Sequence, residues 1–291
     1  MDGRKEASYW ETADNGKVRC HLCPHRCLIS PGKRGLCRVR ENEGGTLYTI
    51  NYGLVSSLAL DPIEKKPLNR FYPGSLILSA GSTGCNFACP FCQNHSIARA
   101  APEEIATHYI PPEELADNAA ALKDSGNIGV AYTYNEPMIW FEYVLDAARA
   151  VKKRGMKNVL VTNGYVCKEP LEELLPNIDA MNIDLKAFDQ GFYKNVVRGG
   201  LAEVKETIAA SAKACHVEVT TLVIPGLNDS AEDIKKMAEW LANISPDLPL
   251  HLSRFFPKHE MTDRAPTSRH SLNELAVAAR EYLNYVYIGN V

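Results

Sequence analysis

The chain has 291 residues, 45% of them hydrophobic, so it is long enough for one large domain with a substantial core, or one domain plus a small appendage. Its formal net charge of −3 gives no basic field of the kind that attracts nucleic acid or anionic lipid. The charged N-terminal stretch MDGRKEASYW lacks the apolar core of a signal peptide, and no segment has the apolar length of a membrane span. We therefore expect a cytoplasmic protein that binds neither nucleic acid nor membrane.

A cysteine-rich segment occupies residues 1–48. It contains the stretch CHLCPHRCLISPGKRGLC, whose thiols are Cys20, Cys23, Cys27 and Cys37. In a reducing cytosol such clustering is typical of metal ligands rather than disulfides. The four thiols could bind a zinc ion or an auxiliary iron–sulfur cluster, and His21 or His25 could replace one of them. We predict a small metal-binding module, structural rather than electron-carrying, because the segment has few apolar runs to hold it folded.

Residues 49–73 are predicted to be a connecting arm, since their Pro and charge pattern supports neither a long helix nor a central strand. Over residues 74–291 short apolar runs alternate with segments of helical spacing. The strand candidates are SLILSA, IGVAYTY, NVLVTNG, AMNIDL, VEVTTLV and LHLSRF. Six such units without a reversal favour an α/β fold of the partial (β/α)6, TIM-like barrel type over a doubly wound open sheet. Functional groups should gather where its strands end.

The loop GSTGCNFACPFCQNHS follows the first of these strands and holds Cys85, Cys89 and Cys92. Gaps of three and two residues allow the loop to curl around a 4Fe–4S cluster and to supply three thiolates, which leaves one iron open for a small ligand. Gly81 and Gly84 would permit the tight turns. The alternative is an electron-transfer cluster or a zinc site completed by a distant cysteine such as Cys167 or Cys215.

The pattern Cys-x3-Cys-x2-Cys, with Phe91 before the last cysteine, resembles the signature of radical S-adenosylmethionine (SAM) enzymes. The chain is most similar to pyruvate formate-lyase activating enzyme-like proteins, and within them to AmmeMemoRadiSam system radical SAM enzymes. The likeness covers CHLCPHRC, DPIEKKPL, the cysteine loop, TYNEP and the closing YVYIGNV. Members of that group often continue into a further cysteine pair, whereas this sequence ends at Val291. The resemblance implies a 4Fe–4S cluster and SAM, cleaved reductively to a 5′-deoxyadenosyl radical.

The resemblance also implies a set of cofactor-binding residues near the strand ends. YTYNEP is similar to the family's Gly-Gly-Glu-Pro, with Tyr134 and Asn135 in place of the glycines, and NIDLKAF is similar to an Asp-x-Lys motif. The set is Phe91, Asn135, Glu136, Thr162, Asn163, Asp184, Lys186, Arg254 and Phe256. Three alternatives remain: Glu136 could favour the start of a helix, TNG could be an ordinary turn, and Asp184 with Lys186 could be a buried ion pair.

The function implied by the resemblance is a radical SAM oxidoreductase similar to glycyl-radical activating enzymes. Its partners would be a protein or peptide substrate and a low-potential electron donor of the ferredoxin or flavodoxin type. One alternative keeps the radical chemistry but modifies a small molecule or transfers a methyl group. The other is a non-catalytic iron–sulfur or zinc protein. The residues that contact the substrate are not identified.

Overall fold

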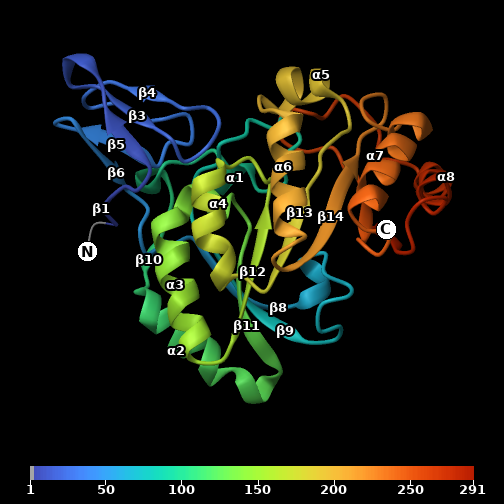
Figure 1. The fold of residues 1–291 in the computed structure, drawn as a ribbon, viewed down its shortest axis with the longest axis horizontal. Coiled ribbons are helices and arrows are strands. Elements are labelled where there is room, and N and C mark those ends of the chain that lie inside the picture. Colours follow the sequence, from blue (N-terminus) through green and yellow to red (C-terminus); the bar gives the residue numbers. More distant parts are fainter. Residues whose placement is uncertain (1–2) are drawn as a thin grey trace.

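An eight-stranded mixed sheet dominates the computed structural model, which describes residues 3–291 (Figure 1). The sheet order is β16-β15-β14-β13-β12-β11-β9-β8, in which β8 is antiparallel to β9 and the other strands are parallel. The strand bounds are β8 Ser57–Pro62, β9 Leu76–Gly81, β11 Asn127–Tyr132, β12 Lys157–Thr162, β13 Ala180–Asp184, β14 His216–Val223, β15 Leu250–Arg254 and β16 Val286–Gly289.

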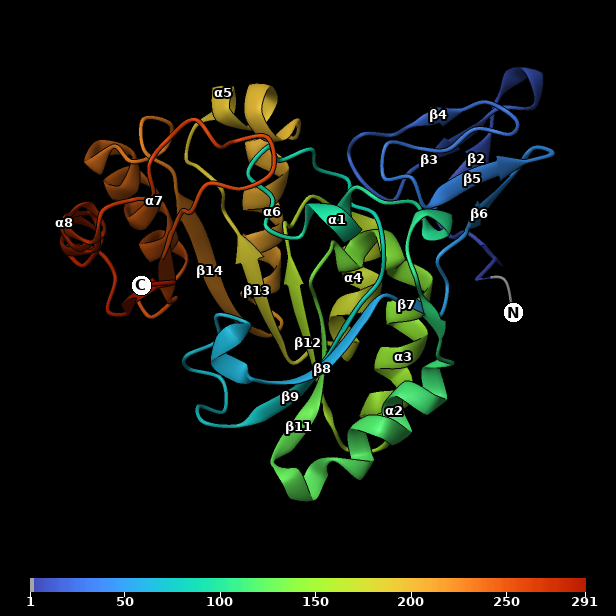
Figure 2. The ribbon, with the colours of Figure 1, turned by 180° about the vertical axis from the view of Figure 1, so that it is seen from behind.

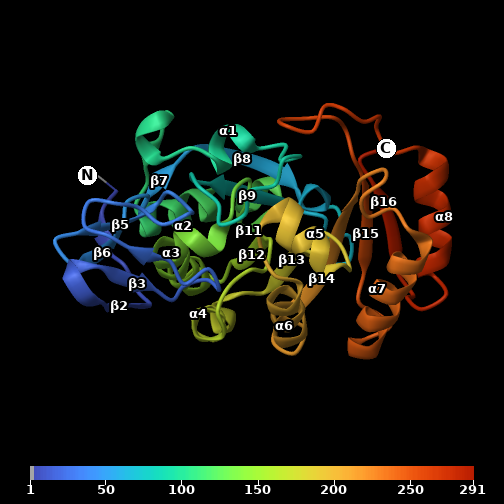
Figure 3. The same ribbon diagram turned by 90° about the horizontal axis from the view of Figure 1, so that it is seen from above.

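Seen from above, the sheet bends into an arc and its longer helices cover the convex side (Figure 3). The helices are α1 His95–Ala98, α2 Pro112–Ala121, α3 Phe141–Lys153, α4 Lys168–Leu174, α5 Gln190–Phe192, α6 Leu201–Ser211, α7 Ala231–Ile244 and α8 Arg269–Ala279. In α3 the residues Val144, Ala148 and Val151 recur on one buried face, and Gly155 ends the segment with a positive φ of 67°.

The predicted α/β fold is confirmed, since the six expected strands form within two residues of their expected bounds and follow one another in chain order. Strands β8 and β16 extend the sheet at its two edges and were not predicted. Strand β8 comes from the segment expected to be a connecting arm. It ends at Pro62, which an edge strand tolerates because one side of its backbone needs no partner.

The N-terminal residues form two small sheets beside the upper end of the large one (Figures 1 and 2). Their strands are β1 Lys5–Glu6, β2 Trp10–Thr12, β3 Val18–Cys20, β4 Leu28–Ile29, β5 Arg40–Glu43 and β6 Thr46–Thr49. Val18, Ile29 and Leu47 belong to the same apolar cluster as the barrel core. We retain the division into 1–48, 49–73 and 74–291 as a proposal; residues 1–2 lie outside the described part of the chain.

The remaining short strands, β7 Leu54–Val55 and β10 His108–Tyr109, pair with each other. Within residues 3–291, none of the helices combines the length and the apolar character needed to cross a bilayer.

Candidate active site

A cavity of about 270 Å³ lies at the carboxyl ends of the parallel strands, and Cys85, Cys89 and Cys92 are on its wall. Within residues 3–291, no fourth thiol and no imidazole lines it, so neither Cys167 nor Cys215 completes the set. In the same residues no three His, Cys, Asp or Glu side chains are grouped to hold one metal ion. A 4Fe–4S cluster does not need that arrangement, because each thiolate binds a different iron. The three thiols and the open space between strand ends therefore fit such a cluster.

The cysteine loop is held in place by Asn135, which follows β11. Its side-chain amide donates to the carbonyl oxygens of Thr83 and Gly84, each at 3.0 Å, and its Oδ1 accepts a hydrogen bond from the backbone N–H of Ser82 at 2.9 Å. Gly84 has a φ of +83°, a conformation that glycine adopts without strain. Asn135 thus acts mainly on the backbone that precedes Cys85.

Burial raises the pKa of all three thiols, that of Cys89 to about 12 and that of Cys85 well above its ordinary value. The nearby Lys186 cation acts in the opposite direction on Cys89. A bound metal centre would counteract this effect of burial by stabilising the thiolates.

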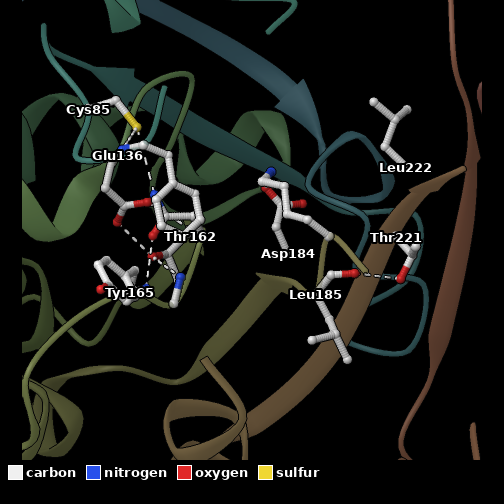
Figure 4. Close-up of polar contacts among 12 residues, drawn as sticks. Cys85, Glu136, Thr162, Tyr165, Asp184, Leu185, Thr221 and Leu222 are labelled. Carbon is white, nitrogen blue, oxygen red and sulfur yellow. Dashed lines mark hydrogen bonds and ion pairs between the residues drawn. The ribbon is translucent and has the colours of Figure 1, made fainter. Parts of the chain in front are cut away.

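Glu136 joins the ends of β11 and β12 from a buried position (Figure 4). Its Oε1 accepts from the Thr162 hydroxyl at 2.6 Å and from the Met138 N–H at 2.9 Å, while Oε2 accepts from the Asn163 N–H at 2.8 Å. The Asn163 side-chain amide in turn lies 3.7 Å from the Cys85 sulfur. Glu136 caps the turn after β11, in agreement with the alternative prediction that it favours the start of a helix. It also positions Thr162 and Asn163 against the cysteine loop.

Burial raises the pKa of Glu136 from 4.5 to about 7, despite the hydrogen bonds that favour the carboxylate. Because the folded state binds this proton more tightly, the associated stability is present below about pH 4.5 and is lost as pH rises through about 7. In cluster-free protein, we expect the unfolding free energy of wild type to fall relative to Glu136→Gln by about 3 kcal/mol across this range. Urea unfolding at a series of pH values measures these free energies. Parallel plots of unfolding free energy against pH for the two proteins would contradict the expectation.

Asp184 and Lys186 place opposite charges on the same cavity wall, at the end of β13. Their Oδ2 and Nζ atoms are 2.7 Å apart. Burial disfavours the Lys186 cation, but the nearby acidic groups, Asp184 first among them, together outweigh burial and raise the pKa of Lys186. Both side chains remain partly exposed, at 32% and 14%, so the pair faces the cavity instead of being sealed in the core.

The structure brings seven of the nine predicted cofactor-binding residues to the cavity but not Arg254 and Phe256. Arg254 donates from Nε to the Thr267 carbonyl at 2.7 Å, and its guanidinium lies 4.8 Å from the Phe256 ring centroid. Neighbouring residues on a strand face opposite sides, and here Ser253 of β15 is the one on the cavity wall. Contact of Arg254 and Phe256 with the cofactor stays a prediction; the Phe256 carbonyl accepts a hydrogen bond at 3.3 Å from Gln93, which lines the cavity.

Several lining residues were not predicted as site residues, namely Gln93, Asn94, Thr133, Tyr134, Thr220, Leu222 and Ser253. Thr220, Leu222 and Ser253 could have been found from strand alternation, because Asp184 pairs with Thr220 and Leu222 pairs with Ser253 in register. Tyr134 carries no such signal. It adopts a φ of +72°, and its hydroxyl donates to Asp61 Oδ2 at 2.6 Å.

Asp61 anchors both Tyr134 and Lys66, whose side chain is 3% exposed and lies 2.8 Å from the carboxylate. Removing one partner of such a pair leaves the other charge buried, so Asp61→Asn should lower the unfolding free energy by roughly 2–4 kcal/mol. Glu232→Gln is the matched control, because its partner Lys236 is exposed and the loss should stay within about 0.5 kcal/mol. Equal denaturation midpoints for the two variants would contradict this role of Asp61.

The four N-terminal cysteines line a second, much smaller cavity together with His25, whereas His21 is not on its wall. Cys20 and Cys37 are buried, and Cys23 and Cys27 are partly exposed. All nine cysteines of the chain lie within the described residues and are free.

Comparison with known proteins supplies further evidence. The sequence model of the Radical SAM superfamily matches residues 80–241. An uncharacterized protein of Methanocaldococcus jannaschii is 44% identical over 291 residues, which is 99% of this chain and 85% of the relative. The pyruvate formate-lyase-activating enzyme of Clostridium pasteurianum is 27% identical over 165 residues, 55% of this chain and 67% of that enzyme.

Among solved structures, Streptococcus suis SuiB bound to S-adenosylmethionine has a TM-score of 0.57 and 14% identity. The match covers 71% of this chain and 48% of SuiB, so this chain spans about half the length of that protein. At this identity the likeness concerns the fold alone.

Proposed function

The chain belongs to the Radical SAM superfamily, and from this premise we propose that it is a radical SAM enzyme that acts on a protein partner, as activating enzymes do. Members of this superfamily typically use a 4Fe–4S cluster and SAM. When bound, the reduced cluster would supply one electron to the sulfonium of SAM, which would break its S–C5′ bond and give methionine and a 5′-deoxyadenosyl radical that abstracts hydrogen from a substrate. One observation carries the proposal: three thiols line the cavity together with the Asp184–Lys186 ion pair. No fourth thiol from residues 3–291 lies on its wall.

The cluster would be held by Cys85, Cys89 and Cys92. Three protein ligands leave one iron for the amine and carboxylate of the methionine part of SAM. Asp184 and Lys186 would match this zwitterion with opposite charges, Lys186 toward the carboxylate and Asp184 toward the amine or the ribose. Their Oδ2 and Nζ atoms lie 2.7 Å apart, and the pKa of Lys186 is raised, which favours its charged form.

The remaining residues would position these ligands. Asn135 fixes the backbone before Cys85, and Glu136 holds the Thr162–Asn163 turn next to the Cys85 sulfur. Phe91 is 4% exposed, and its ring would keep water from the loop that carries Cys89 and Cys92. The site thereby excludes solvent from one side while the cavity mouth stays accessible.

A protein or peptide partner is supported by the activating-enzyme relatives, whose identity to this chain is 26–27%. We extend the proposal to a cytoplasmic setting, where a ferredoxin or flavodoxin would supply the electron.

To test the proposed function, protein reconstituted anaerobically with iron and sulfide is given dithionite and SAM, and 5′-deoxyadenosine is quantified. A cell extract is then separated by size, and its macromolecular fraction is expected to speed SAM consumption unless it is treated with protease. A full cluster without 5′-deoxyadenosine would refute radical SAM chemistry, and stimulation by the small-molecule fraction alone would refute the protein partner.

A further inference from the structure

The second cavity is lined by all four N-terminal thiols, which come from β3 and from the loops on either side of β4. Four thiols that share one cavity can fill a tetrahedral shell completely. This differs from the larger cavity, where three thiols leave one position open. We propose that Cys20, Cys23, Cys27 and Cys37 form a closed metal centre, and that this centre positions the loop that carries Cys85.

The surroundings of the second cavity suit a negatively charged centre. Four thiolates around a divalent ion carry a net charge of about −2, and a 4Fe–4S cluster with four thiolates is also an anion. Arg26 and Arg40 line the same cavity. Arg40 is 1% exposed, and although it pairs with Glu142 and donates to the Ser8 carbonyl at 2.8 Å, its Nε has no hydrogen-bond partner among the described residues. A thiolate shell would supply the missing acceptor.

The cavity between the thiols is small, about 10 Å³, and the thiols are not grouped around one point. Binding therefore requires side-chain rotation for a zinc ion, and for a cluster it also requires the loop that carries the partly exposed Cys23 and Cys27 to move outward. Both centres share the chemistry of four thiolates, and their metal content distinguishes them.

The loops that carry the second cysteine set contact the residues on both sides of Cys85. A Cβ added at Gly84 would lie 2.5 Å from the carbonyl oxygen of Cys37, so this carbonyl packs directly on the Gly84 backbone. On the other side of Cys85, the Asn86 carbonyl lies 2.8 Å from His25 Nε2, and Asn86 also lines the second cavity. Fixing Cys37 and the loop of His25 through a common metal would therefore fix both backbone neighbours of Cys85.

The metal count tests the site without reference to catalysis. The full-length protein is purified anaerobically, and its zinc and iron are measured by mass spectrometry. Wild type is expected to hold metal in addition to the cluster at Cys85, either about one zinc or about four further irons. Cys23→Ser should lose this metal, whereas Cys215→Ser, whose thiol lies outside both cavities, should keep it. Wild type without additional metal, or Cys23→Ser that retains it, would overturn the proposal.

The positioning role rests on the cluster proposed above, and its readout is separate. His25→Ala keeps all four thiols but loses the contact with Asn86, so we expect the additional metal to remain while the three-cysteine cluster loses iron to a chelator about ten times faster. His25→Gln can place an amide N–H where Nε2 lies and should restore the rate. The EPR spectrum of the reduced cluster should likewise change in His25→Ala and stay close to that of wild type in His25→Gln. Equal iron release from wild type, His25→Ala and Cys23→Ser would overturn the coupling.

The two proposals can fail separately. In Cys89→Ser the first cluster is removed, and the additional metal should persist because none of its four ligands changes. If wild type forms no 5′-deoxyadenosine yet holds the additional metal, only the proposed function fails.

Discussion

Cys89→Ser should reduce 5′-deoxyadenosine formation by about 10³-fold or more, equivalent to about 4 kcal/mol or more in the barrier, because the cluster would lose one of only three protein ligands. Cys89 lies between the other two thiols in the loop and on the wall of the cavity. Iron at this site should drop with the activity. The matched control is Cys215→Ser, whose sulfur contacts the Ser211 carbonyl at 3.6 Å and which should keep both iron and activity.

This result separates a cluster ligand from a packing residue. The two variants make the same atomic change, and both thiols have a pKa raised to about 12 by burial. Circular dichroism should show similar folding for both. Full activity in Cys89→Ser would contradict the proposed cluster, and equal loss in both variants would indicate a general effect of thiol removal.

Lys186→Met should weaken SAM binding by about 10–100-fold, or about 1.4–2.8 kcal/mol, while the iron content stays near that of wild type. The variant removes the cation but keeps a side chain of similar length, and it leaves the Asp184 carboxylate without its partner at 2.7 Å. The measurement is the SAM concentration that half-converts the EPR signal of the reduced cluster.

Lys186→Arg is the matched variant, because it keeps the charge and should retain most of the affinity. Since Asp184 raises the pKa of Lys186, the wild-type affinity should show no loss from deprotonation of this lysine at neutral or mildly basic pH. Unchanged SAM affinity in Lys186→Met would restrict the pair to a structural ion pair.

The sequence predicted the site best where backbone position alone decides which residues meet. The carboxyl ends of parallel strands lie at one edge of the sheet, so Cys85, Glu136, Thr162 and Asp184 could be expected together once the strands were assigned. The open three-thiol arrangement also followed from the spacing, and the structure brings no fourth thiol from residues 3–291 to that cavity.

The sequence failed where side-chain direction decides. Ser253 was not chosen, although the alternation of β15 puts it on the cavity wall, whereas Arg254 and Phe256 were chosen from a motif and their contact with the cofactor stays a prediction. Tyr134 has a left-handed backbone, and its hydroxyl donates to Asp61, which is 73 residues away in the chain, so nothing local indicates this contact. The contact of Cys37 with Gly84 likewise depends on tertiary packing between two cysteine-rich loops.

The proposed cluster at Cys85, Cys89 and Cys92 would have one iron that no protein side chain binds. Mössbauer spectroscopy of the ⁵⁷Fe-reconstituted Cys23→Ser protein measures this directly, because the second cysteine set is then broken. Adding SAM is expected to change the isomer shift of one iron in about four and to leave the other three unchanged. Four irons that do not respond to SAM, or a spectrum without a 4Fe–4S cluster, would contradict it.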